Sequence, residues 1–109
     1  MSDEKPKPAT SSLNVLMDDC ASRLKVLADE TRLNVLRQLM DGPKHVGELN
    51  QALGLELSLL SHHLKVLREA QLVCAERDGK AVLYRLAPNV EGQRQGKAIN
   101  LGCCLISFQ

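Results

Sequence analysis

The stretch LSLLSHHLKVLREAQLVCAERDGKAVLYRL, residues 57–86, changes its hydrophobic period half-way along. Up to residue 70 the apolar residues recur at steps of three and four, which predicts a helix. The leucines expected on its buried face are Leu57, Leu60, Leu64 and Leu67. After it, two β-rich runs flank Asp78-Gly79, which predicts a hairpin with a type I′ turn. A helix followed by a hairpin is the order of a recognition helix and its wing.

The residues before this stretch predict the rest of a helix-turn-helix. One helical pattern begins at Leu13, and a second begins with Asp29 as its N-cap and stops at Gly42-Pro43. A third, short helix ends at Gly54. The expected fold class is therefore mainly α with a small β-hairpin, a winged helix-turn-helix.

Composition agrees with such a fold. The 109 residues are 44% hydrophobic but only 2% aromatic, so the core must be aliphatic, which favours helices packed through leucine stripes. We expect a disordered tail over 1–12, the winged domain over 13–88, and a segment over 89–109, helical or extended, that carries a Cys-Cys pair. The absence of a long apolar run and of a signal peptide predicts a cytoplasmic chain with reduced thiols and no membrane partner.

A second face of the 57–70 helix is polar. Short hydroxyls lie near its N-terminus and longer donors follow, an order that suits phosphates and base edges in a major groove. These residues are Ser58, Ser61, His62 and Lys65, and the hairpin adds Arg77 and Lys80. The alternative is that this polar face is an ordinary solvent-exposed helix surface without a ligand. The net charge of +1 gives no global attraction for nucleic acid, so binding of double-stranded DNA must come from local placement of charge.

The adjacent cysteines Cys103 and Cys104 predict a ligand site more than a disulfide. Neighbouring Cα atoms are about 3.8 Å apart, whereas disulfides prefer roughly 4.4–6.8 Å. Two thiolates can instead chelate a soft ion, and trivalent arsenic or antimony takes three thiolates in a pyramid. The alternative is a pair of buried or idle thiols, and Cys74 on the first hairpin strand is expected to be structural.

The segments LKVLADETRLNVLRQL (24–39) and LSLLSHHLKVLREAQLVCAERDGKAVLYRL (57–86) together resemble the ArsR/SmtB family of bacterial metalloregulatory winged-helix repressors. The resemblance covers roughly residues 20–88. It implies a cytoplasmic homodimer that represses its operon and releases DNA when an inducer binds. It also implies a dimer interface made by the first and last helices, and an operator that faces Ser58, Ser61, His62 and Lys65.

Two sensor sites of that family are missing here. A Cys-x-Cys in the first helix of the helix-turn-helix is replaced by KHVGELNQAL, which holds only His45, expected as an exposed helix-start residue. A zinc site of Asp and His residues on the last helices is absent, since neither type occurs after residue 88. His63 is expected to be a packing residue. The resemblance places the first helix near the C-terminal region across the dimer interface, which makes Cys20 of the partner subunit the third candidate ligand beside Cys103 and Cys104. The alternative for Cys20 is a small apolar residue on the buried stripe of its helix.

The sequence thus favours a repressor, not an enzyme, that leaves its operator when As(III) or Sb(III) binds cysteine thiolates. It needs no resident cofactor, and no RNA partner is expected. A thiol redox sensor that joins Cys20 to Cys103 or Cys104, or a sensor of Cd(II), Pb(II) or Zn(II), remains open. A small thiol oxidoreductase is a distant alternative, because the chain lacks a Cys-x-x-Cys motif and a phosphate loop.

Overall fold

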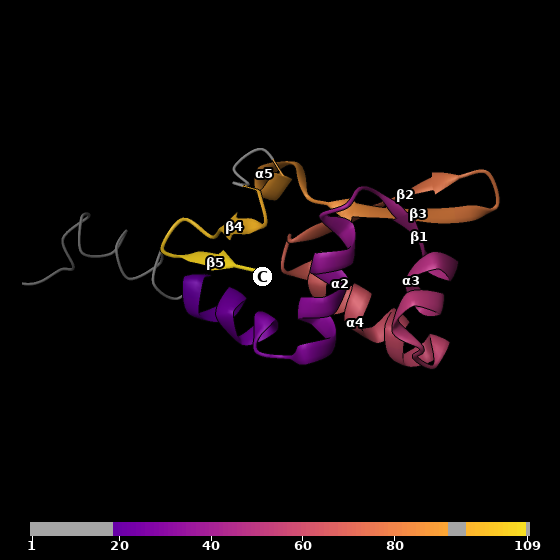
Figure 1. Ribbon diagram of the computed structural model, residues 1–109, viewed down its shortest axis with the longest axis horizontal. Helices are drawn as coiled ribbons and strands as arrows, with labels where there is room; N and C mark the ends of the chain where they lie inside the picture. Colours follow the sequence, from indigo (N-terminus) through magenta and orange to yellow (C-terminus); the bar gives the residue numbers. More distant parts are fainter. Residues whose placement is uncertain (1–18, 92–95, 109) are drawn as a thin grey trace, which may run out of the picture.

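The computed structural model describes residues 19–91 and 96–108 (Figure 1). The predicted tail over 1–12 and the predicted helix start at Leu13 lie outside these residues. A helix over 19–27 comes first. The remaining elements are, in chain order, α2 Glu30–Leu39, β1 Lys44–His45, α3 Val46–Leu53, α4 Leu57–Glu69, β2 Val73–Asp78, β3 Ala81–Leu86, α5 Pro88–Glu91, β4 Ala98–Asn100 and β5 Leu105–Ser107.

Local signals fix the ends of the helices. The carboxylate of Asp29 accepts a 2.9 Å hydrogen bond from the backbone N–H of Arg32, so Asp29 caps α2 as predicted. Gly54 ends α3 in the left-handed conformation, with φ of 64°, which glycine adopts without steric cost. These two caps fix where α2 starts and where α3 stops, and Gly54 thereby begins the turn of the helix-turn-helix.

The core is aliphatic, as the composition predicts. Helices α2, α3 and α4 bury leucines against one another and against the base of the hairpin; the fully buried ones include Leu36, Leu49, Leu60, Leu64 and Leu67. Leu72, between α4 and β2, is fully buried in the same core. The prediction for Leu57 is wrong, because its side chain is 55% exposed at the first position of α4. The helical period places Leu57 at the edge of the buried face, next to the exposed Ser61.

The predicted hairpin is present as β2 and β3, which pair antiparallel and project as a wing (Figure 1). The predicted turn is one residue out of register: Asp78 pairs with Ala81, so Gly79 and Lys80 form the turn. Gly79 has φ of 67° and Lys80 has no positive φ, a pattern typical of a type II′ turn and not of type I′. The short strand β1 joins β3 on its other side, giving the sheet order β1-β3-β2.

The described part of the segment over 89–109 holds one helical turn and two short strands. After the single turn of α5, β4 pairs antiparallel with β5 to form a second hairpin. The backbone N–H of Leu101 donates to the carbonyl of Cys104 at 2.9 Å, which closes the loop 101–104 between the two strands. Ile99 and Leu101 are buried against the main core, so this hairpin packs on the domain. Figure 1 places it beside the helix over 19–27 and at the opposite end of the molecule from the wing.

Within the described residues, no helix combines the length and the apolar character that crossing a membrane requires.

Candidate functional site

The polar face predicted for α4 lies on the surface. Its four residues are all exposed, while the leucines on the opposite face of the helix are fully buried. The exposed residues are Ser58, Ser61, His62 and Lys65. A single rigid helix therefore presents two hydroxyls, an imidazole and an ammonium group on one side, with the core holding its other side.

An acidic residue that the sequence analysis did not single out borders this face. Glu56 is the N-cap of α4, and its carboxylate accepts a 2.5 Å hydrogen bond from the hydroxyl of Ser58. A carboxylate at a helix N-terminus stabilises the helix. The same charge repels phosphate, so the Ser58 end of the face favours base edges over the DNA backbone.

The wing tip is basic because its one acidic residue, Asp78, pairs with a histidine outside the wing. Arg77 and Lys80 are exposed, whereas the carboxylate of Asp78 lies 2.7 Å from Nε2 of His45. His45 is the N-cap of α3, as predicted, and its Nδ1 lies 3.2 Å from the carboxylate of Glu48. The hydrogen bond to Asp78, with a smaller contribution from Glu48, raises the pKa of His45. The contact between His45 and Asp78, 33 residues apart, has no local sequence signal.

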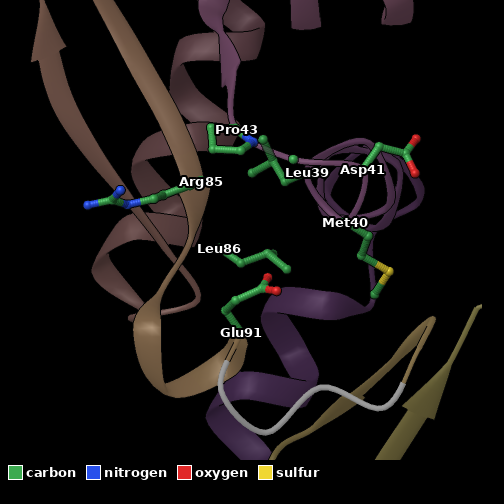
Figure 2. Close-up of a pocket in the computed structure, with 8 residues that line it drawn as sticks. Leu39, Met40, Asp41, Pro43, Arg85, Leu86 and Glu91 are labelled. Atoms are coloured by element: carbon green, nitrogen blue, oxygen red, sulfur yellow. The ribbon is translucent and has the colours of Figure 1, made fainter.

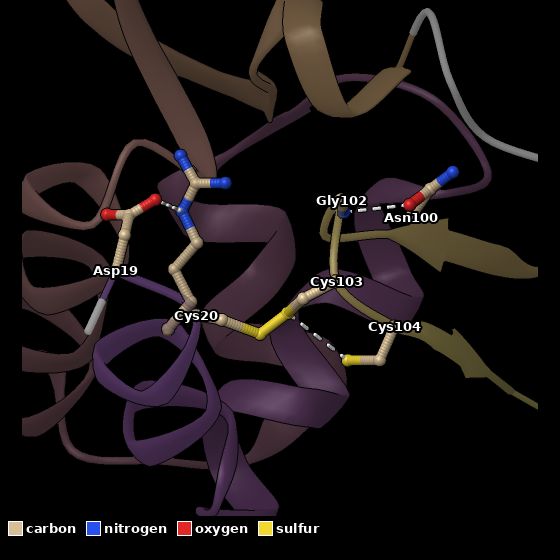
Figure 3. Close-up of a disulfide and its surroundings, with 7 residues drawn as sticks. Asp19, Cys20, Asn100, Gly102, Cys103 and Cys104 are labelled. Carbon is tan, nitrogen blue, oxygen red and sulfur yellow. Dashed lines mark hydrogen bonds and ion pairs between the residues drawn. A yellow bond between two sulfur atoms is a disulfide. The ribbon is translucent and has the colours of Figure 1, made fainter. Parts of the chain in front are cut away.

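Three cysteines meet beside the helix over 19–27 (Figure 3). Their sulfur atoms all lie within 4.8 Å of one another: Cys20 from that helix, and Cys103 and Cys104 from the loop 101–104. Cys20 and Cys103 are joined as a disulfide with a Cα–Cα distance of 6.3 Å, and the sulfur of Cys104 lies 3.9 Å from that of Cys103. Gly102, with φ of 93°, allows the tight loop that turns the pair toward the helix.

The three cysteines of this cluster belong to one chain. The resemblance implied that the third thiol is Cys20 of the partner subunit, which stays a prediction; within one chain, β4 and β5 fold back and bring the chain's own Cys20 to the pair. The extended hairpin makes this reach possible, where the family resemblance implies a last helix. Cys74 lies on β2, half-buried and opposite Arg85, and belongs to no such cluster among the described residues.

His63 is a packing residue, as predicted. It is 8% exposed on the buried side of α4, and its Nδ1 lies 3.1 Å from Nη1 of Arg32. The Nε of Arg32 also donates to the backbone carbonyl of Val26 at 2.6 Å. Arg32 thus connects the helix that carries Cys20 to the helix that carries the polar face.

A cavity of about 280 Å³ lies between the end of α2, β3 and α5 (Figure 2). Leu39, Met40 and Leu86 give it apolar walls, and Asp41 and Glu91 add carboxylates. None of the residues predicted to bind DNA or metal lines it.

The chain matches known regulators. Residues 29–74 fit the family profile described as "Bacterial regulatory protein, arsR family". The HTH-type transcriptional regulator NmtR of Mycobacterium tuberculosis is 42% identical over 79 residues, which cover 72% of this chain. The chain spans 66% of the length of NmtR and 53% of the length of the SmtB repressor of the same species. The names of these relatives describe transcriptional regulators and not enzymes, as predicted.

Solved structures agree on the fold. Reduced HlyU from Vibrio cholerae superposes with a TM-score of 0.68 at 34% identity, over 74% of this chain and 86% of HlyU. The homodimeric winged helix-turn-helix DNA-binding domain of Mb0332 from Mycobacterium bovis gives a TM-score of 0.69 at 30% identity, over 85% of this chain and 82% of that domain. The chain therefore belongs to the ArsR family of bacterial regulatory proteins and has a winged helix-turn-helix fold.

Proposed function

We propose that this chain is a cytoplasmic, homodimeric transcriptional repressor that leaves its operator when As(III) or Sb(III) binds Cys20, Cys103 and Cys104. The observation that carries the proposal is the approach of these three sulfur atoms to within 4.8 Å of one another.

DNA binding rests on α4 and the wing. The exposed residues Ser58, Ser61, His62 and Lys65 enter the major groove, while Arg77 and Lys80 contact flanking phosphates. One module contacts only a short stretch of DNA. Two copies of the chain in a dimer present two such helices to successive turns of the duplex and so contact a longer operator. The homodimeric Mb0332 domain supports this arrangement.

Inducer binding rests on the chemistry of the thiols. Soft thiolates select soft ions and metalloids, and three of them satisfy a pyramidal As(III) or Sb(III). Reduction of the disulfide between Cys20 and Cys103 by a cellular dithiol returns both thiols and leaves the reductant as a disulfide. Arsenous acid then exchanges its three hydroxyl groups for the sulfur atoms of three thiols, and the three thiol protons leave with the hydroxyl groups as three water molecules.

Coupling to DNA follows from the position of the cluster. A bound ion fixes the loop 101–104 against the helix over 19–27, and Arg32 connects that helix to His63 on α4. An inducer weakens DNA binding only as far as it binds the DNA-free form of the protein more tightly than the DNA-bound form. Such coupling typically lowers DNA affinity by about 5- to 150-fold.

The second candidate is a thiol redox switch. It is favoured by the disulfide itself, which joins the helix over 19–27 to the second hairpin without any metal. In this switch, hydrogen peroxide takes two electrons and two protons from the thiols of Cys20 and Cys103 and is reduced to two water molecules. The disulfide that forms changes the affinity of the protein for its operator. The similar HlyU structure is described as a reduced form.

One titration tests both candidates. The reduced protein, bound to fluorescent DNA from upstream of its gene, is titrated with As(III), Sb(III), Cd(II), Zn(II) and, separately, hydrogen peroxide. The proposal expects release by As(III) and Sb(III), loss of that release in Cys103→Ser and Cys104→Ser, and normal release in the control Cys74→Ser. Release by peroxide alone, with a loss of two hydrogen atoms from the protein mass, would establish the redox switch instead. Release by Cd(II) or Zn(II) alone would mean that a divalent metal, and not As(III) or Sb(III), is the inducer.

A further inference from the structure

Two leucines in the first turn of α4 are exposed in a chain that buries its other α4 leucines completely. The side chain of Leu57 is 55% exposed and that of Leu59 is 44% exposed, whereas Leu60, Leu64 and Leu67 have no exposed surface. Covering apolar side chains of this size removes them from water, so a partner that covers them gains binding free energy.

The two leucines flank the polar face. Successive residues of a helix are separated by 100°, so Leu57 and Leu59 lie on either side of Ser58. Leu57 lies one turn before Ser61, and Leu59 lies one turn before His62. The exposed apolar surface is therefore continuous with the residues that the proposed function directs at base edges.

The chemistry of the major groove supplies an apolar partner there. Thymine presents its C5-methyl group in that groove, and aliphatic side chains distinguish thymine through it. Hydroxyls contact several bases without strong preference. Glu56 holds the hydroxyl of Ser58, which leaves the leucines as the discriminating groups of this turn.

We propose that Leu57 and Leu59 determine operator specificity by contacting thymine methyl groups on either side of the base that faces Ser58. The inference rests on the proposed DNA-binding function. It adds a preference for A·T pairs whose thymine methyls face the first turn of α4.

Replacement of thymine by deoxyuridine tests this inference, because it removes the methyl group and leaves base pairing unchanged. A duplex is selected from a randomised library with the reduced full-length protein, and each thymine is then replaced singly. We expect wild-type affinity to fall by about fourfold at two or more positions, the equivalent of one buried methyl group each. We expect Leu57→Ala and Leu59→Ala to bind the parent duplex more weakly, and each to lose its sensitivity at one of those positions. Leu59→Met, which keeps an apolar side chain, should retain that sensitivity.

Each alternative outcome overturns a different statement. If no duplex is selected, the proposed DNA-binding function fails. If a duplex is selected but deoxyuridine has no effect, or has the same effect in wild type and both alanine variants, thymine recognition by these leucines is wrong. If the alanine variants dissociate the dimer in sedimentation experiments while the deoxyuridine effect persists, the leucines form a protein contact instead. Because both side chains are exposed, the variants should fold normally, which circular dichroism checks.

Discussion

Nη1 of Arg32 lies 3.1 Å from Nδ1 of His63, a buried imidazole on the inner side of α4. Arginine can only donate, so Nδ1 of His63 is the acceptor of this hydrogen bond. The same guanidinium donates to the carbonyl of Val26 at the end of the helix over 19–27. One side chain therefore satisfies an acceptor on each of two helices, the one that carries Cys20 and the one that carries the polar face.

Removal of this side chain should destabilise the fold. We expect Arg32→Ala to lower the free energy of unfolding by about 1–3 kcal/mol, because it leaves the Val26 carbonyl and the His63 ring without their donor. Urea denaturation followed by circular dichroism measures the loss. Arg37→Ala, an exposed position on the same helix, should change it by no more than about 0.5 kcal/mol. Equal losses in the two variants would contradict the bridging role.

Charge reversal on the polar face should weaken DNA binding without affecting folding. We expect Lys65→Glu to lower operator affinity about tenfold or more, because an exposed cation next to phosphates becomes an anion. A gel-shift titration at fixed salt measures the affinity. Lys97→Glu makes the same change of charge beside β4, at the other end of the molecule from the wing, and should bind nearly as wild type. An equal loss in both variants would mean that only net charge matters.

Local patterns in the sequence predicted most of the helix-turn-helix and its wing. Caps such as Asp29 and Gly54 depend on their immediate neighbours, and hydrophobic periods identify a helix or a hairpin within ten residues or so. The polar face of α4 was predictable for the same reason, since one helix fixes the direction of all four side chains.

Features that depend on distant residues were missed. The exposure of Leu57 depends on which elements pack against the start of α4. The wing turn depends on a register that the pairing of Asp78 with Ala81 determines. The position of Cys20 beside Cys103 depends on β4 and β5 folding back over 83 residues of sequence. Short glycine-bearing strands give little periodicity, so the sequence left that segment open between helix and extended chain.

The salt dependence of binding should report the wing contacts. We expect Arg77→Ala and Lys80→Ala each to reduce the slope of log affinity against log salt concentration by about 0.9, the value for one lost phosphate contact. Fluorescence anisotropy between about 50 and 200 mM salt measures the slope. Lys97→Ala serves as the control and should retain the wild-type slope. Wild-type slopes in both wing variants would exclude phosphate contacts at the tip.

The pair between His45 and Asp78 should depend on pH. The pKa of His45 is raised, so the stability that this pair contributes is complete below the ordinary imidazole pKa of 6.5 and is lost as pH rises through the raised value. Asp78→Asn removes the largest cause, and we expect the pKa of His45 to fall toward 6.5. NMR titration of the imidazole protons measures it. Glu76→Gln is the control, since Glu76 pairs with Arg85; an unchanged pKa in Asp78→Asn would contradict the assignment.

Mixed dimers should show that each thiol cluster is built within one chain. A dimer of a Cys20→Ser chain and a Cys103→Ser, Cys104→Ser chain has no complete intrachain set, but it has one complete set if ligands cross the interface. A dimer of wild type and a chain with all three substitutions has the opposite property. From the approach of Cys20 to Cys103 and Cys104 within one chain, we expect As(III) to bind the second mixed dimer once and the first not at all. Differently tagged chains allow both dimers to be purified, and thiolate-to-arsenic absorbance with metal analysis counts the bound ions. The reverse result would return the third ligand to the partner subunit.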